Sequence, residues 1–199
     1  MTERRNFTLK IEFLSYWHAG SGLGRGKDID AVVLKSRDGL PYLPGRTVKG
    51  LLKEAFENLS EIGLCSADTV MTVFGSEGSR NSEGQGTITV ENALLPENER
   101  AFLSSAEGEV LKSGLYETLS STAIDKDGRA KDRSLRTIEV AVPVTLFSEI
   151  TITDSAEADL SLNKFEELLN KACGLIRSAG SHRNRGFGRC RCSCAKRGE

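Results

Sequence analysis

The chain has 199 residues, of which 38% are hydrophobic and 28% are charged, and this composition is typical of a folded globular protein. No segment is long and apolar enough to cross a membrane, and no apolar signal core follows the first residues, so we expect a cytoplasmic protein. The net charge of −1 argues against a uniformly basic nucleic-acid binder.

The charges are nevertheless distributed unevenly along the chain. Residues 171–199 contain eight Lys or Arg and one acidic residue, whereas residues 91–117 contain six glutamates against Arg100 and Lys112. Such asymmetry is typical of a protein that holds a polyanion on one face. The alternative is that these charges average out once the chain has folded.

The N-terminal segment predicts a strand, a glycine-rich loop and a short extended run. Residues 7–14 alternate between apolar and polar side chains, as in a strand with one buried face. Residues 31–34 are apolar, and residues 37–39 form an expected turn. Because no helix follows the glycines of the loop, a dinucleotide-binding loop is not indicated.

The glycine-rich loop, residues 18–30, is the best candidate for chemistry. It carries His18, Arg25, Lys27, Asp28 and Asp30 among four glycines. A carboxylate close to a backbone phosphate can hold Mg²⁺ or position the attacking 2′-hydroxyl of RNA. The alternative is that both aspartates only solvate the loop.

Residues 39–50, Gly-Leu-Pro-Tyr-Leu-Pro-Gly-Arg-Thr-Val-Lys-Gly, predict a tight turn that leads directly into a helix. Apolar residues at helical spacing place this helix over about residues 47–59, with Thr47 as its expected N-cap. Arg46 and Lys49 stand beside the amides of the first turn, which favours a bound anion. The alternative is an ordinary turn with solvated charges.

The middle of the chain predicts loops that alternate with strands. Residues 76–86 are polar and glycine-rich, which indicates a loop, and residues 87–90 have the pattern of a strand. Residues 120–133 are charged and have little apolar content, so we expect them to project from the core as a hairpin or loop. Residues 138–144 and 147–152 predict one or two further strands.

The C-terminal segment predicts a helix, a basic loop and a last strand. The helix is ended by Gly180, and its apolar face consists of Phe165, Leu168, Leu169, Ala172 and Ile176. The loop, residues 178–189, has three glycines, which let the backbone approach a polyanion, and three arginines, which bind phosphate bidentately. Its His182 lies among these arginines, so we expect the pKa of His182 to be lowered.

The five cysteines are expected to be free thiols, because their number is odd and no secretory signal precedes them. Cys190, Cys192 and Cys194 alternate with Arg191 and Ser193, which is the period of a strand with one buried face. A zinc site is the alternative, but its cysteines are usually spaced to converge on one ion.

The expected order of strand, helix, strands, helix and strand is that of a ferredoxin-like α+β sandwich, which RNA-recognition modules share. We expect residues 1–199 to form a single domain with insertions over about residues 76–86 and 120–136. The second insertion would be a projecting, thumb-like hairpin.

Three segments in this order resemble motifs of the RAMP superfamily, the RNA-binding subunits of CRISPR effector complexes. Residues 39–50 are similar to that family's Gly-x-Pro-Tyr-x-Pro-Gly-x-x-x-Lys-Gly motif, and residues 178–189 are similar to its C-terminal glycine-rich loop. Residues 123–140 together with Phe147 resemble a block of the repeated backbone subunit of type III complexes. The resemblance extends from about residue 9 to residue 194.

The resemblance implies a backbone subunit of a type III CRISPR ribonucleoprotein that binds guide RNA and cleaves the paired target RNA with Mg²⁺ or another divalent cation. Its partners would be guide RNA, target RNA and other effector subunits, including copies of itself, and no membrane. One alternative is a RAMP structural subunit without catalysis. Another, less favoured, is a guide-processing ribonuclease that uses His18.

In the type III backbone subunit an aspartate of the glycine-rich loop carries cleavage, so the resemblance assigns catalysis to Asp28 or Asp30 and metal binding to Asp28. We prefer Asp28, because Asp30 adjoins the extended run and can anchor the loop by hydrogen bonding. The expected RNA-binding residues are the basic side chains and histidines of these motifs: His18, Arg25, Lys27, Arg46, Lys49, Arg136, His182, Arg183, Arg185 and Arg189.

Overall fold

The computed structural model describes residues 4–22, 29–76, 86–153 and 161–197. Its central element is an antiparallel sheet of four strands in the order β2-β5-β1-β6. These strands are β1 (Arg4–Phe13), β2 (Ile88–Val90), β5 (Thr145–Thr153) and β6 (Cys190–Lys196). Because β1 and β2 both pair antiparallel with β5, they run parallel to each other with β5 between them.

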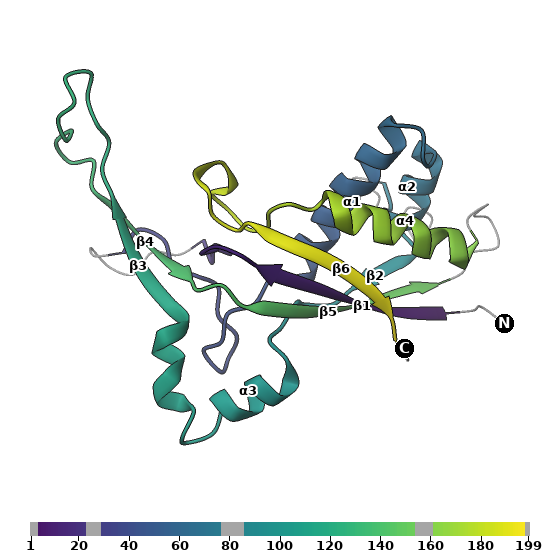
Figure 1. Ribbon diagram of the computed structural model, residues 1–199, viewed down its shortest axis with the longest axis horizontal. Coiled ribbons are helices and arrows are strands. Elements are labelled where there is room, and N and C mark those ends of the chain that lie inside the picture. Colours follow the sequence, from purple (N-terminus) through teal and green to yellow (C-terminus); the bar gives the residue numbers. More distant parts are fainter. Residues whose placement is uncertain (1–3, 23–28, 77–85, 154–160, 198–199) are drawn as a thin grey trace.

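The helices lie against one face of this sheet (Figure 1). They are α1 (Gly45–Glu61), α2 (Ala67–Phe74) and α4 (Leu162–Leu175). The ring of Phe165 on α4 lies 5.7 Å from the ring of Phe7 on β1 and 6.0 Å from that of Phe56 on α1. With α1 between β1 and β2 and α4 between β5 and β6, the order is that of the ferredoxin-like fold, and the predicted fold class is confirmed.

The inner strand β1 supplies one side of the core. Its side chains alternate, and Phe7, Leu9, Ile11 and Phe13 are all buried beneath the helices. This confirms the strand predicted over residues 7–14. The burial follows from the position of β1 between β5 and β6, where one face is covered by α1 and α4.

Two expected helix boundaries are wrong. The N-cap of α1 is Pro44 rather than Thr47, and no side chain of its own caps the helix. The amide of Gly45 instead donates to Oδ1 of Asn92, at 2.8 Å. Helix α4 ends at Leu175, before Gly180. Gly180 has φ +92° in the following turn, where an added Cβ would lie 2.7 Å from the carbonyl oxygen of His18.

A second, two-stranded sheet forms a hairpin from β3 (Tyr116–Ser121) and β4 (Arg136–Ala141), which we call the thumb. Its tip extends away from the central sheet (Figure 1), as predicted for residues 120–136. Internal hydrogen bonds shape the tip: Oδ1 of Asp125 accepts from the amides of Asp127 and Arg129, both at 2.9 Å.

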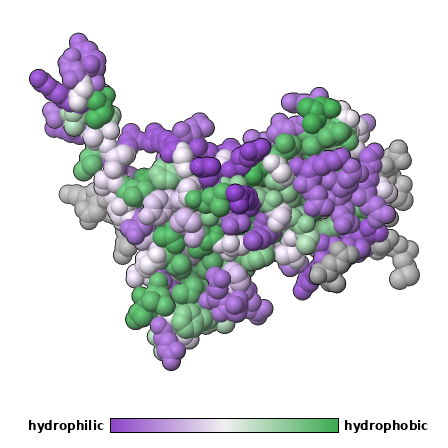
Figure 2. Space-filling view, in the orientation of Figure 1, coloured by the Kyte–Doolittle hydropathy of each residue, from purple (hydrophilic) through white to green (hydrophobic). Residues whose placement is uncertain are grey.

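Between β2 and the thumb lies a lobe that the sequence did not predict. It contains α3 (Glu97–Leu103) and the 3-10 helix η2 (Glu109–Leu115), neither of which has a fully buried residue. Figure 2 shows much of this lobe as hydrophobic surface. Its exposed apolar side chains are those of Phe102, Val110 and Leu111.

The last strand, β6, confirms the core interpretation of the cysteines. Cys190 is buried, Cys192 and Cys194 are half-buried, and the residues between them are exposed. All five cysteines are free thiols. Within the described ranges, no group of three or more His, Cys, Asp or Glu side chains is placed to hold a metal ion.

Candidate nucleic-acid interface

The glycine-rich loop has two described ends, which we call its first leg (residues 17–21) and its second leg (residues 29–35). The legs pair with each other: the amide of Ser21 donates to the carbonyl of Val32, at 3.2 Å, and that of Leu34 donates to Ala19, at 2.7 Å. Arg25, Lys27 and Asp28 belong to the part of the loop outside the described residues, so their assigned roles stay predictions.

The second leg also pairs with the thumb, alongside β4. The amide of Asp30 donates to the carbonyl of Thr137, at 2.8 Å, and the amide of Glu139 donates to that of Ala31, at 2.9 Å. Oδ2 of the exposed Asp30 accepts from the amide of Thr137, at 2.7 Å. Asp30 therefore anchors the loop, although it does so to the thumb and not to the loop's own amides. Its catalytic role stays a prediction.

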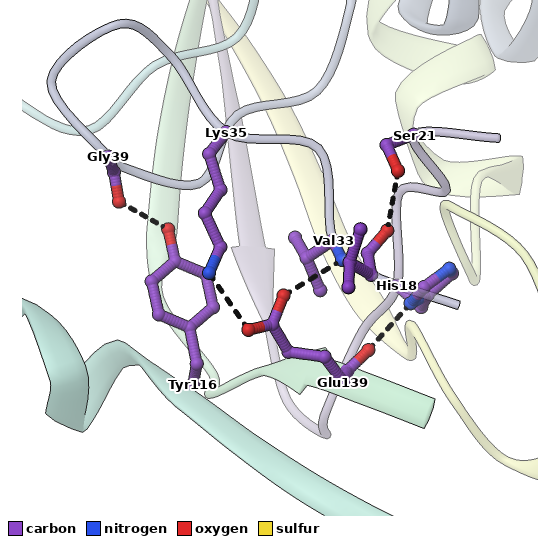
Figure 3. Close-up of polar contacts among 8 residues, drawn as sticks. His18, Ser21, Val33, Lys35, Gly39, Tyr116 and Glu139 are labelled. Carbon is purple, nitrogen blue, oxygen red and sulfur yellow. Dashed lines mark hydrogen bonds and ion pairs between the residues drawn. The ribbon is translucent and has the colours of Figure 1, made fainter. Parts of the chain in front are cut away.

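Glu139 of β4 joins these parts at the base of the thumb, and sequence reasoning missed it (Figure 3). Its carboxylate is buried, with a side-chain exposure of 8%. Oε2 accepts from the amide of Val33, at 3.0 Å, and Oε1 accepts from Nζ of Lys35, at 2.8 Å. A carboxylate removed from water in this way needs such partners, because its desolvation is costly.

Tyr116 of β3 completes the contact between the second leg and the thumb. Nζ of Lys35 lies 3.8 Å from the centre of the Tyr116 ring, and the Tyr116 hydroxyl donates to the carbonyl of Gly39, at 2.7 Å (Figure 3). Burial, and then the charge of Glu139, raise the pKa of Tyr116 well above its usual range. The tyrosine is therefore a neutral hydrogen-bond donor at physiological pH.

His18, predicted to bind RNA, lies in the interior with 2% of its surface exposed. Its Nδ1 lies 2.7 Å from the carbonyl oxygen of Glu139, and because a carbonyl only accepts, Nδ1 carries the proton. The carbonyl of His18 accepts from the amide and hydroxyl of Ser181, at 2.8 and 3.0 Å. His18 thus connects the thumb base with the C-terminal loop, and its contact with RNA stays a prediction.

The C-terminal glycine-rich loop is fixed against the chain that leaves β1. The amide of Gly188 donates to the carbonyl of Tyr16, and the amide of Leu14 donates to that of Arg189, both at 2.7 Å. Gly188 has φ +70°, and an added Cβ there would collide with the carbonyl of Ala179. The loop is held in place by these contacts while its arginines stay exposed.

The arginines of this loop face solvent beside α1. Arg183, Arg185 and Arg189 are exposed. Nη1 of Arg183 lies 3.5 Å from Oε2 of Glu54, an exposed pair that contributes little stability. Arg183 and Arg177 line a hollow of about 130 Å³ between α1 and the residues after α4. Arg177 is a basic residue at this surface that sequence reasoning did not single out.

His182 lies between the buried His18 and the exposed arginines. Its ring is 5.8 Å from that of His18, and its backbone is left-handed, with φ 59°. Its pKa is lowered from the usual value, first by burial and then by His18 and Arg185. The expected direction is confirmed, but burial is a larger cause than the neighbouring positive charge.

The polar groups at the start of α1 have more hydrogen-bond partners within the protein than expected. The amides of Thr47 and Val48 donate to the carbonyl of Pro44, at 2.8 and 3.0 Å. Nζ of Lys49 donates to the carbonyl of Ile88 in β2, at 3.2 Å, and burial followed by repulsion from Lys53 lowers the pKa of Lys49. Arg46 is exposed. The anion contact at this helix start stays a prediction. Arg46 is the better candidate for it, because Arg46 is exposed whereas Nζ of Lys49 is bonded to Ile88.

Apart from Arg46 and Lys49 at the start of α1, the predicted residues within the described ranges fall into two groups that His18 joins. Asp30 and Arg136 lie where the second leg meets the thumb, and Arg136 is the exposed first residue of β4. His182 and the three arginines form the C-terminal loop. The one signal for the missed Glu139 was an acidic side chain within the apolar run of residues 138–144, since its partners lie more than 100 residues away in sequence.

Comparison with known proteins gives a family and a similar solved structure. No curated protein sequence matches the chain. A chain in the cryo-EM structure of the type III-B Cmr-beta complex bound to cognate target RNA superposes with a TM-score of 0.69. The match covers 95% of this chain and 96% of that chain at 12% identity, so it demonstrates a shared fold.

No helix in the described ranges is long and apolar enough to span a membrane.

The family model that matches is that of the RAMP superfamily, and it aligns with residues 10–191. This range takes in the glycine-rich loop, the thumb and the C-terminal loop. The chain therefore belongs to the RAMP superfamily.

Proposed function

We propose that this protein is a guide-RNA-binding backbone subunit of a type III CRISPR ribonucleoprotein effector, which cleaves the target RNA paired with the guide. RAMP membership supports this proposal, as does the shared fold with a chain of a type III-B complex bound to target RNA. Partners would be guide RNA, target RNA and other effector subunits, including copies of this chain.

The structure of the C-terminal loop is the observation that best supports RNA binding. The loop, residues 178–189, contains three Arg and no Asp or Glu. The backbone hydrogen bonds of Gly188 and Arg189 hold the loop in place. The backbone that carries the exposed guanidinium groups is therefore fixed, and the groups can reach phosphates from it. Contacts of this kind are blind to sequence, and base pairing between guide and target supplies the specificity.

The cleavage proposal assigns the reaction to the glycine-rich loop. Asp28, and in second place Asp30, would act with Mg²⁺ near the scissile phosphate, where a metal ion can stabilise the developing charge. Cleavage is supported by the motif resemblance and by the position of the loop's second leg, which lies against the thumb. The thumb would separate the guide–target duplex at regular intervals along the guide.

The second candidate is a structural RAMP subunit without catalysis. The hydrogen bond from the amide of Thr137 to Oδ2 of Asp30 supports it as far as Asp30 is concerned, since a carboxylate engaged with the backbone has less capacity for a metal ion, and Asp28 would then have to be idle as well. In this case the same basic loop would hold guide RNA, and another subunit would cut the target.

Two measurements test the proposal. The purified protein should shift a repeat-derived guide RNA in a gel, and should not do so at high salt, because phosphate contacts are screened. An effector reconstituted with this chain should then cut labelled, guide-complementary target RNA when Mg²⁺ is added. Binding without cutting would support the structural alternative, and absence of both guide binding and co-purified RNA would refute the proposal.

A further inference from the structure

We propose that Glu139 is a positioning residue that fixes both legs of the glycine-rich loop to the base of the thumb. It thereby sets the place of the leg that carries Asp30 relative to the thumb. This inference rests on the proposed function, because the two parts would act on the same RNA duplex. It assigns Glu139 no contact with RNA or with a metal ion.

The first line of evidence is that Glu139 contacts both legs through its own polar atoms. Its carbonyl accepts from Nδ1 of His18 in the first leg, at 2.7 Å. Its carboxylate accepts from the amide of Val33 and from Nζ of Lys35 in the second leg, at 3.0 and 2.8 Å. As Figure 3 shows, these partners converge on one residue of β4. Moving β4 therefore moves both legs.

The second line of evidence is the cost of placing a carboxylate there. The Glu139 side chain is 8% exposed, and its neighbours in the strand, Val140 and Ala141, are fully buried. An apolar side chain of similar volume at a buried ion-pair position is often neutral or stabilising. The carboxylate offers what an apolar group lacks, namely fixed directions of hydrogen bonding to the second leg. Register, rather than stability alone, accounts for the charge at this position.

The third line of evidence is that the joint is hydrogen bonded along its length. The second leg is hydrogen bonded to β4 at Asp30, Ala31 and Val33, and to the first leg at Val32 and Leu34. Lys35 then covers the ring of Tyr116 on β3, so both thumb strands take part. The legs and the thumb base are therefore joined as the strands of a short sheet are, and the buried Glu139 carboxylate lies where the second leg meets β4.

The test compares Glu139→Gln with Glu117→Gln in the full chain. Glutamine keeps the size of Glu139 and an oxygen for the Val33 amide, and removes the ion pair with Lys35. Glu117 is the control because it lies in β3 of the same hairpin, opposite Val140, and is exposed. Amide hydrogen exchange over residues 29–35 should be about tenfold faster in Glu139→Gln, the factor for one lost charge-assisted hydrogen bond. It should be unchanged in Glu117→Gln.

Lys35→Met provides a second variant, which breaks the same ion pair from its half-exposed end. It should speed exchange over the same residues, and the double variant Lys35→Met/Glu139→Gln should exchange no faster than Lys35→Met alone, because Lys35→Met already removes the ion pair together with the Lys35–Tyr116 contact. Additive effects would show that the two side chains act separately, and would overturn the proposal. Unchanged exchange in all three variants would overturn it as well.

In the reconstituted effector, Glu139→Gln should leave guide affinity unchanged. It should slow target cutting about tenfold or spread the cuts over adjacent bonds, as expected for misplaced reacting groups. Cutting with wild-type rate and position would contradict a positioning role. If the wild-type effector itself cuts no target, the cleavage part of the proposed function fails, and hydrogen exchange alone then decides whether Glu139 fixes the legs.

Discussion

At the scale of single residues, Asp30 is the candidate aspartate that the described part of the chain includes, and its hydrogen bonds explain its position. Asp30 holds the amide of Thr137 with Oδ2 and the carbonyl of Thr137 with its own amide, so its position follows that of the thumb. The sequence suggested this anchoring role from the neighbouring apolar run. It did not identify the partner, which lies 107 residues away in the chain.

The first prediction separates anchoring from catalysis at Asp28 and Asp30. Asp28→Ala should abolish Mg²⁺-dependent target cutting and leave guide binding intact, because one lost carboxylate hardly changes a phosphate-dominated interface. Asp30→Asn retains an oxygen for the Thr137 amide and removes the charge, so it should still cut, whereas Asp30→Ala should cut less. Rates are measured on labelled target in the reconstituted effector.

Two results would change this assignment. Full cutting by Asp28→Ala together with no cutting by Asp30→Asn would transfer catalysis to Asp30. Full cutting by every variant would mean that another residue or another subunit cleaves the RNA. The second result would favour the structural alternative for this chain.

The second prediction concerns the protonation of His182. Burial lowers its pKa below the usual 6.5, so below that pH the unfolded chain binds more protons than the folded chain. The stability that depends on neutral His182 is therefore present above about pH 6.5 and is lost as the pH falls through the folded pKa. His182→Gln should remove this part of the pH dependence in denaturant unfolding.

The same histidine reports on bound RNA. Phosphates close to the ring favour its charged form, so the pKa of His182 should rise when guide RNA binds the C-terminal loop. Titration of the His182 ring protons by NMR, with and without RNA, measures this shift. An unchanged titration would place the RNA elsewhere.

At the scale of elements, the sequence predicted those helices and strands that have a regular apolar face, because hydrophobic periodicity can be recognised without knowledge of the tertiary contacts. Strand β1 and helices α1 and α4 each bury a regular apolar face, and all three were expected within a few residues. Helix α3 was missed because it has no buried residue and thus no apolar stripe to detect. Helix α2 was missed although Ser66 caps it and Val70, Val73 and Phe74 are buried, a signal that the sequence does contain.

The boundaries and caps were less predictable than the elements, because their partners are distant in sequence. Asn92, 47 residues from Gly45, binds the first amide of α1, so Thr47 had no capping role to fill. Gly180 follows the end of α4 by several residues. A glycine is needed there because an added Cβ would collide with the carbonyl oxygen of His18, and not because the helix ends there. In both cases a local rule was overridden by a long-range contact.

The third prediction compares two basic residues at the start of α1. Arg46→Glu should keep the fold and weaken guide binding, because Arg46 is exposed and Glu is compatible with a first helical turn. Lys49→Met should lower the free energy of unfolding by about 1 kcal/mol, the usual net value of one hydrogen bond, since Nζ of Lys49 donates to β2. Thermal unfolding and gel shifts measure the two effects.

The two variants have different failure modes. Guide binding by Arg46→Glu at wild-type affinity would show that the helix start does not contact RNA. An unchanged unfolding free energy in Lys49→Met would show that the bond to Ile88 contributes nothing, and would leave Lys49 available to an anion as the sequence suggested.

At the scale of the whole molecule, a near-neutral chain places basic residues at both ends of the central sheet, because Arg4, Arg5, Lys196 and Arg197 lie together at the end away from the C-terminal loop. The loop with Arg183, Arg185 and Arg189 is fixed beside the end of β1, and the thumb extends beyond it (Figure 1). The glutamates of residues 91–117 lie instead in and around the lobe formed by α3 and η2. The acidic lobe and the C-terminal loop are thus separate parts of the fold, whereas the basic residues of the segment 171–199 are divided between that loop and the far end of β6.

The salt dependence of RNA binding tests the central claim most directly. Replacing Arg183, Arg185 and Arg189 with alanine should reduce the slope of log affinity against log salt by ~2 to 3 units, with equal effect on all guide sequences. The control replaces three exposed basic residues at the far end of β1 and on α4, namely Arg4, Lys164 and Lys171, and should leave the slope unchanged. A slope that stays the same in the loop variant, or falls equally in the control, would contradict RNA binding by the C-terminal loop.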